Sequence, residues 1–191
     1  MNDSYTVVAH LLDYPEADFV ENIGRSLALV SRDRPLLQAF RDRVQTLGVD
    51  RLQETYIETF DFHAETSPYI GHHLFGEEIR RSLFMAELRG RYRECGMVEN
   101  SEVPDHLANV LRFLGAVQTS STQAGEERSE LIYACLVPAI RHMLGAMKAE
   151  NPYTTLLQAI LLICKQETNA VTPDREIAWM PFCSSSSPTL R

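Results

Sequence analysis

The sequence predicts an all-α, single-domain helical bundle. Apolar residues recur at intervals of three and four along most of the chain, the spacing of one buried helix face. Proline, glycine and asparagine punctuate these stretches where helices would begin or end, and no convincing strand pattern is present. The chain of 191 residues, 45% of them hydrophobic, is long enough for one domain with a real core.

Four helices are predicted in the first third of the chain, over residues 6–12, 16–30, 33–47 and 50–60. The first is stopped by Pro15, because proline cannot continue a helix. The third carries Pro35 in its first turn, where a missing N–H costs little, and stops at Gly48. The apolar stripe of the second helix consists of Phe19, Ile23, Leu27 and Val30.

A loop and a long helix follow. Residues 61–76 include Pro68 and two glycines, a composition typical of a loop. A helix is predicted over residues 77–95, because Phe84, Leu88 and Tyr92 are spaced four apart. Gly96 then stands where a C-terminal capping glycine belongs.

The segment Glu102-Val103-Pro104-Asp105-His106-Leu107 predicts another helix start. Proline is tolerated in a first turn, and acids there face the positive end of the helix dipole. The pattern predicts a helix from Pro104 to about residue 117, with Asp105 as a first-turn acid. On local pattern alone, this segment is a well-capped core helix.

The last third is predicted to hold two helices and a tail. Residues 118–129 form the most polar stretch and predict a loop. A helix is expected over 131–147, kinked at Pro138, and another from Pro152, with Asn151 as its cap. The expected helical domain spans residues 1–168. Residues 169–191 are expected to form an irregular, flexible tail that includes four consecutive serines.

The charge balance restricts the classes of partner. The chain has 26 acidic and 18 basic residues, a formal net charge of -8. This balance argues against nucleic acid or an anionic membrane as the main partner and is compatible with a basic peptide. No secretory signal is visible, and the longest apolar run near the C-terminus, residues 159–164, is too short to span a bilayer. We therefore expect a cytoplasmic protein without direct membrane insertion.

A catalytic constellation is not found in the sequence. It contains neither His-Glu-x-x-His nor Gly-x-Ser-x-Gly, and its nine glycines are dispersed. Its four cysteines have no Cys-x-x-Cys spacing and are expected to be free thiols. The alternative is a metal-dependent hydrolase in which His63 meets His72 or His73 across the loop. We expect neither catalytic residues nor a metal site, and hence no enzyme.

Five motifs occur in the order found in one protein family. They are Leu11-Leu12-Asp13-Tyr14-Pro15, Tyr56-Ile57-Glu58-Thr59-Phe60-Asp61, the Tyr-x-x-His-His-x-x-Gly-Glu-x-x-Arg-Arg segment at 69–81, Tyr-x-x-x-Gly at 92–96, and Glu102-Val103-Pro104-Asp105-His106-Leu107. The chain thereby resembles the nitrate reductase delta-subunit (NarJ) family, related to the TorD and DmsD chaperones, over residues 5–165. Ser82, Gly71-His72 and Arg112-Phe113 depart from the common pattern, which leaves open the molybdenum enzyme served.

The resemblance implies a TorD-like bundle that acts as a dedicated chaperone. Such proteins bind the N-terminal segment of an apo molybdenum catalytic subunit until its cofactor is inserted. It implies no permanently bound cofactor, transient contact with the molybdopterin cofactor as an option, and cofactor-biosynthesis proteins as further partners. A helical subunit that stays permanently in the reductase complex remains an alternative.

We expect Tyr69, His72 and Phe75 to form an exposed aromatic loop beside acids, which would suit the binding of a basic amphipathic peptide. The residues expected to bind this client peptide are Tyr56, Phe60, Asp61, Tyr69, His72, Phe75, Arg80, Glu102, Asp105 and His106. Several also have purely structural interpretations. Tyr56 and Phe60 would pack in the core, and Arg80 and Arg81 would pair with Glu77, Asp61 or Asp105. His106 would be a hydrogen-bonded histidine on the helix face, and its place beside Asp105 also allows a titrating hydrogen-bonded pair.

Overall fold

Helices account for all regular structure in the described part of the chain. The computed structural model describes residues 3–28, 34–98, 100–117 and 122–168. Its elements are α1 (Asp3–His10), α2 (Phe19–Ala28), α3 (Arg34–Leu47), α4 (Val49–Phe60), η1 (Ala64–Thr66), α5 (Ile70–Phe75), α6 (Ile79–Glu94), α7 (Leu107–Ala116), α8 (Thr122–Glu130), η2 (Leu131–Leu136), α9 (Val137–Ala146) and α10 (Pro152–Thr168). The predicted all-α class is confirmed. The predicted tail, 169–191, lies outside the described residues.

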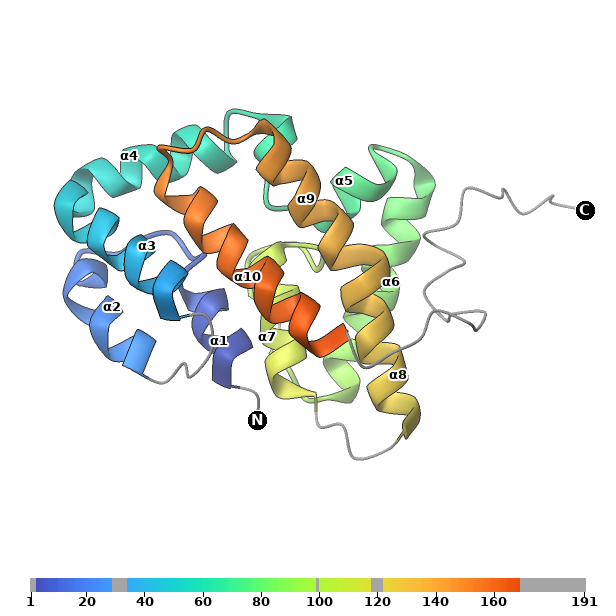
Figure 1. The fold of residues 1–191 in the computed structure, drawn as a ribbon. Coiled ribbons are helices and arrows are strands. Elements are labelled where there is room, and N and C mark those ends of the chain that lie inside the picture. Colours follow the sequence, from blue (N-terminus) through green and yellow to red (C-terminus); the bar gives the residue numbers. More distant parts are fainter. Residues whose placement is uncertain (1–2, 29–33, 99, 118–121, 169–191) are drawn as a thin grey trace, which may run out of the picture.

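The core is built around α7 and α10 (Figure 1). Helix α10 packs between α3 and α9, while α1 lies against α7. Most of α7 is buried, including its glycine, Gly115. A side chain at Gly115 would collide with Thr6 of α1, so glycine permits the close approach of these two helices. Apolar burial of this kind supplies most of the stability of a helical bundle.

The chain from Thr122 to Ala146 is helical throughout, with a π-helical stretch, η2, in its middle. Leu136 and Val137 at the junction both have right-handed helical backbone angles. Pro138 follows directly; it has no N–H, and its ring crowds the carbonyl four residues earlier. The sequence predicted a kink at Pro138, and the structure places the wide π turn just before it.

Helix α8 corrects the predicted loop at 118–129, of which 118–121 lie outside the described residues. The stretch is polar, yet Arg128 is buried. Its guanidinium pairs with Glu167 of α10, donates to the carbonyl of Leu114, and lies 5.0 Å from the ring centroid of Tyr5. The sequence could not reveal this helix, because it is stabilised by ionic contacts with distant residues and has no apolar stripe that a local pattern would show.

Two further predictions of local structure are wrong. The loop expected at 61–76 contains η1 and the short helix α5. The helix expected from Pro104 begins at Leu107, because Pro104 and Asp105 form a turn and His106 is extended and paired with Tyr69. Among the described residues, no helix is long and apolar enough to cross a membrane. Cys95, Cys135 and Cys164 are free thiols, as predicted, and Cys183 lies outside the described residues.

Candidate functional site

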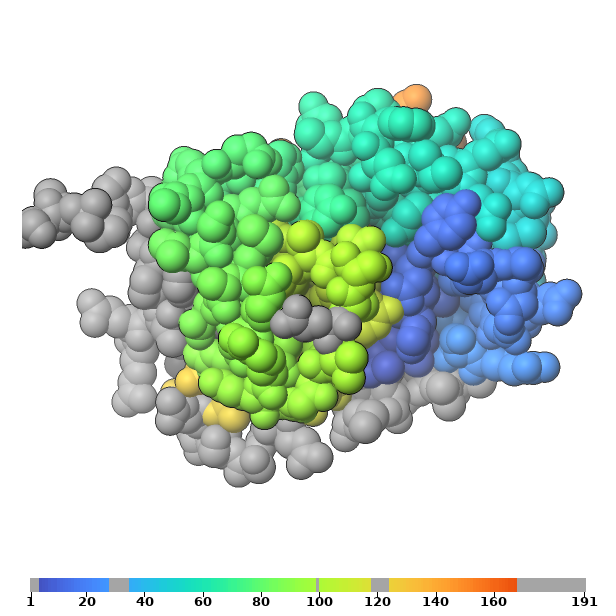
Figure 2. All heavy atoms as spheres, turned by 180° about the vertical axis from the view of Figure 1, so that it is seen from behind, coloured from blue at the N-terminus to red at the C-terminus, as the bar shows by residue number. Residues whose placement is uncertain are grey.

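Two sequence motifs are joined by backbone pairing. The N–H of Ile70 donates to the carbonyl of Asp105 at 2.8 Å, and the N–H of Leu107 donates to the carbonyl of Pro68 at 2.7 Å. Tyr69 and His106 thus form an isolated antiparallel bridge. In Figure 2 the yellow-green segment that follows residue 100 surfaces between the green of α5 and α6, the teal of α4 and the blue N-terminal segment. The surface around this segment is the candidate site.

The end of α6 holds the same segment from the other side. The Tyr92 hydroxyl donates to the carbonyl of Pro104 at 2.7 Å, and its ring packs against Phe113 with centroids 5.2 Å apart. Tyr92 opens the Tyr-x-x-x-Gly motif, and Gly96 behind it has φ +71, a conformation that favours glycine. Three of the five motifs, at 69–81, 92–96 and 102–107, therefore meet around residues 104–107.

Asp105 is fully buried and forms an ion pair. Its Oδ2 accepts from Nε of Arg81 at 2.9 Å, and Oδ1 has no hydrogen-bond partner in the described part of the chain. Asp105 precedes the helix, so the predicted role as a first-turn acid is wrong, and the structure realises the predicted pairing with Arg81. A Cβ at Gly71 would lie 2.7 Å from Oδ2 of Asp105 and 3.0 Å from Cγ of Arg81. Only glycine leaves room for the pair.

His106 is the N-terminal cap of α7. Its Nδ1 accepts from the backbone N–H of Ala108 at 3.2 Å, so the ring proton resides on Nε2. The predicted pair with Asp105 is not formed; the ring instead packs edge-on to Tyr69, with centroids 5.6 Å apart. Burial lowers the pKa of His106 to about 4, with Asp13 opposing and Arg112 adding to the shift. The cap is neutral at pH 7.

Tyr56 and Phe60 belong to the aromatic core. The Tyr56 hydroxyl donates to the carbonyl of Leu12 at 3.2 Å, and its ring contacts those of Phe60 and Tyr153 at 5.0 and 5.7 Å. Both side chains are buried. The core-packing interpretation of Tyr56 and Phe60 describes where the structure places them. Direct contact with a client stays a prediction that the structure does not test.

Carboxylates gather around Tyr69, which is half-buried. Burial raises the pKa of Tyr69, and the negative charges of Glu102, Asp61 and Asp105 raise it further. The pKa of Tyr56 is also raised, by burial and then by Asp61, Asp13 and Glu102. Asp61 and Glu102, which come from different segments, therefore both act on the charge of the two tyrosines.

Each of these surface acids is followed by an exposed apolar side chain. Asp13 precedes Tyr14, Asp61 precedes Phe62, and Glu102 precedes Val103. Tyr14, Phe62 and Val103 are 42%, 72% and 41% exposed. We call these six residues, together with Tyr69, the acidic–apolar face. The predicted binding residues did not include Asp13, Tyr14, Phe62 or Val103, because no local pattern distinguishes an exposed apolar side chain from one that packs in the core.

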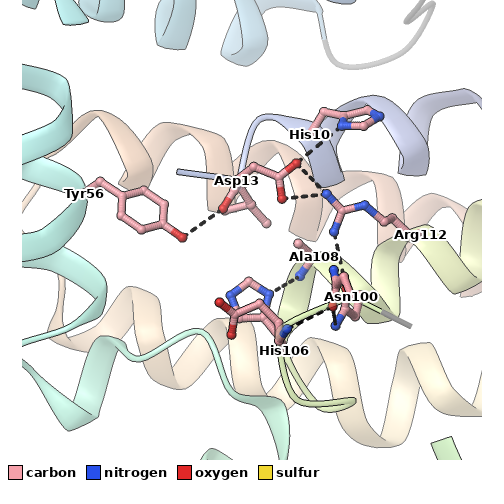
Figure 3. A network of polar contacts seen from close by, with 10 residues as sticks. His10, Asp13, Tyr56, Asn100, His106, Ala108 and Arg112 are labelled. Atoms are coloured by element: carbon pink, nitrogen blue, oxygen red, sulfur yellow. Dashed lines mark hydrogen bonds and ion pairs between the residues drawn. The ribbon is translucent and has the colours of Figure 1, made fainter. Parts of the chain in front are cut away.

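A polar network fixes the border of this face (Figure 3). Nη2 of Arg112 donates to Oδ1 of Asp13 at 2.6 Å, and Nη1 reaches Oδ1 of Asn109 at 3.4 Å. The amides of Asn109 and Asn100 bond reciprocally, at 2.7 and 3.0 Å. The end of α1 is thereby tied to the 100–103 turn. The sequence signals for this network were Arg112, a departure from the family pattern, and Asp13, which belongs to the first motif.

The remaining predicted residues lie on α5 and at the start of α6. His72 is half-buried, with Nδ1 3.2 Å from Oε1 of Glu77, which also accepts from Arg81. Phe75 is buried beneath the guanidinium of Arg80, 5.6 Å from the ring centroid, and Arg80 Nε donates to Glu78. The expectation of an exposed aromatic loop is therefore wrong for Phe75.

The structure offers no support for the metal-hydrolase alternative. No cluster of three or more His, Cys, Asp or Glu side chains suited to a metal occurs within the described ranges.

A pocket of about 430 Å³ lies where α8 meets the ends of α6 and α7, lined by residues that include Arg91, Cys95 and Phe113. It contains none of the predicted site residues.

Comparisons with known proteins agree with the motifs. The chain is 24% identical over 173 residues to the probable nitrate reductase molybdenum cofactor assembly chaperone NarW of Escherichia coli (strain K12), covering 90% of this chain and 72% of NarW. It is 22% identical over 165 residues to the probable chaperone of the same description, NarJ, of Bacillus subtilis (strain 168), covering 83% and 86%. The family model described as nitrate reductase delta subunit matches residues 28–145, more than half of the chain. The chain therefore belongs to the nitrate reductase delta-subunit family.

Proposed function

We propose that this protein is an assembly chaperone for a molybdenum oxidoreductase. It binds the N-terminal segment of the apo catalytic subunit and assists insertion of the molybdenum cofactor. Two relatives carry names that describe nitrate reductase molybdenum cofactor assembly. Their names support nitrate reductase or a related enzyme as the client.

The main observation that supports peptide binding is that each acid of the acidic–apolar face is followed in the sequence by an exposed apolar side chain. Asp61-Phe62 and Glu102-Val103 present a carboxylate and an exposed apolar group side by side. A basic amphipathic segment needs both: apolar contacts for affinity and carboxylates for its cationic side chains. The net charge of -8 would attract such a segment from a distance.

The rigidity of this face also supports the proposal. Backbone pairing of 68–70 with 105–107 and the Arg81–Asp105 ion pair fix Tyr69 in place. A preorganised surface loses less conformational entropy on binding than a mobile one. We assign Asp105, His106, Tyr56, Phe60 and Phe75 to this supporting role and assign direct contact to the acidic–apolar face.

Chemistry on the client is not part of the proposal. Binding of a segment requires no covalent step, so we propose a chaperone without enzymatic activity and without a permanently bound cofactor. The protein would contact the molybdopterin cofactor only transiently, while it holds the client. We place this step in the cytoplasm, as the family resemblance implies.

Co-production with the client tests this function. The apo catalytic subunit is produced with wild-type protein, with an Asp61→Asn, Glu102→Gln double variant, or without the chaperone, and molybdenum per purified subunit is measured. We expect molybdenum content to fall toward the chaperone-free level with the double variant.

The matched control is the Glu21→Gln, Glu126→Gln double variant. It makes the same change of charge at exposed acids on α2 and α8. Equal molybdenum loading with the two double variants would mean that the acidic–apolar face has no special part. Full loading without any chaperone would contradict the function itself.

A further inference from the structure

Two histidine nitrogens from distant parts of the sequence meet where α5 packs against α9 (Figure 1). Nδ1 of His73, on α5, lies 3.2 Å from Nδ1 of His142, on α9. The two rings are nearly perpendicular, at 79°, with centroids 5.1 Å apart. Both nitrogens therefore point toward one spot between the helices. None of the motifs that define the family includes His142.

The hydrogen bonding of His73 leaves its Nδ1 as an acceptor, which takes the Nδ1–H of His142 when no ion is bound. Nε2 of His73 lies 2.7 Å from the carbonyl oxygen of Ser67, a group that can only accept, so Nε2 carries the ring proton. Burial lowers the pKa of His73, which keeps the ring neutral at pH 7. A neutral imidazole with its remote N–H bonded to a backbone carbonyl is the usual arrangement of a metal-binding histidine.

The spacing of the two nitrogens fits a shared ion. Zinc binds histidine nitrogen at about 2.0–2.1 Å, and two such nitrogens 3.2 Å apart would subtend about 100° at the metal. That angle is close to tetrahedral. We propose that His73 and His142 bind one divalent transition-metal ion of the zinc class, which includes nickel and copper(II).

The remaining coordination positions would be filled by water or by a partner's side chain. The neighbouring His72 directs its Nδ1 toward Glu77, and the described residues offer no group of three candidate ligands. Two imidazoles suit a borderline ion, whereas magnesium and calcium prefer oxygen ligands. His142 is exposed, so the ion can enter from solvent.

Bound metal would link α5 to α9. The first residue of α5, Ile70, donates its N–H to the Asp105 carbonyl, so the ion would also stabilise the segment that carries Tyr69. This inference is independent of the proposed chaperone function, because it needs only the two imidazoles and their geometry.

Calorimetric titration with zinc chloride tests the site. The full chain is used with Cys95→Ser and Cys183→Ser, which removes the exposed thiol and the thiol of the C-terminal region. We expect one equivalent of zinc to bind, His142→Gln and His73→Gln each to weaken binding at least tenfold, and magnesium to give no heat. His63→Gln, a change at an exposed histidine, is the matched control and should bind as the parent does.

Thermal unfolding gives a second readout. Zinc should raise the melting temperature of the parent and of His63→Gln but leave that of His142→Gln unchanged, because only a ligand that binds the folded state stabilises it. Absence of zinc binding in the parent would overturn the proposal. Unaltered binding by His142→Gln, or an equal loss with His63→Gln, would overturn it as well. Since His142 is exposed, its variant should fold.

Discussion

Acidification should destabilise this protein through the histidine that caps α7. The folded state keeps His106 neutral, with a pKa of about 4, whereas an unfolded histidine titrates near 6.5. Because the pKa of His106 is lower in the folded than in the unfolded state, the stabilisation that comes from the neutral ring is complete above about pH 6.5. This stabilisation is lost as the pH falls from 6.5 toward 4. Across that window the shift of about 2.5 units amounts to roughly 3 kcal/mol, since each unit is about 1.4 kcal/mol. Between pH 7 and 4.5 we expect a loss of about 2 kcal/mol from this group.

His106→Asn isolates that contribution. Asparagine keeps a capping acceptor for the Ala108 N–H but does not titrate. Urea unfolding of wild type and variant at pH 7 and pH 4.5 should show the wild type losing about 2 kcal/mol more than the variant. His63→Asn changes an exposed histidine and should keep the wild-type pH dependence. If His106→Asn and wild type lose the same free energy of unfolding, the neutral cap is refuted.

Two further predictions concern the buried ion pair. Gly71→Ala places a methyl group against Asp105 and should lower the free energy of unfolding by about 1–3 kcal/mol. The control, Gly24→Ala, has open space around it and should raise the free energy of unfolding by about 0.5–1 kcal/mol. Equal effects of the two substitutions in urea titration would contradict the close approach of Gly71 to Asp105. Arg81→Met leaves the fully buried Asp105 without its partner and should lower the free energy of unfolding by about 3–5 kcal/mol. Glu77→Gln, which removes the exposed partner of Arg81, should lower it by less than about 1 kcal/mol. An effect of Arg81→Met as small as that of Glu77→Gln would contradict the pairing of Arg81 with Asp105.

Local pattern predicted the long apolar helices well and the irregular segments poorly. Phe84, Leu88 and Tyr92 repeat every four residues, all three are buried, and α6 lies within two residues of the expected bounds. The start of α7 was misplaced at Pro104, because its true cap is His106 and the preceding residues pair with 68–70. Such pairing depends on residues more than 30 positions away.

The site illustrates the same limit. The motif residues were found, but their division into buried support and exposed contact surface depends on tertiary structure. The sequence predicted that Asp105 would stabilise the start of a helix through the helix dipole, whereas the structure buries Asp105 in an ion pair with Arg81. Phe62 directly follows one motif and Val103 lies inside another, and neither was predicted to bind, yet both are exposed next to Asp61 and Glu102.

The most direct test of the account is the affinity of the client segment for the acidic–apolar face. A synthetic peptide copying the N-terminal ~15–30 residues of the catalytic subunit is titrated calorimetrically into the wild type and two variants. Phe62→Ala should weaken binding about tenfold, while Ile79→Ala, at a similarly exposed apolar residue on α6, should leave it unchanged.

A scrambled peptide of equal charge is the control for the client segment. The account predicts that the scrambled peptide binds much more weakly than the native one, since apolar side chains in a fixed order supply most of the affinity. It also predicts that Asp61→Asn with Glu102→Gln reduces the salt dependence of binding. Equal affinity of the native and scrambled peptides, or equal losses with Phe62→Ala and Ile79→Ala, would contradict the proposed binding face.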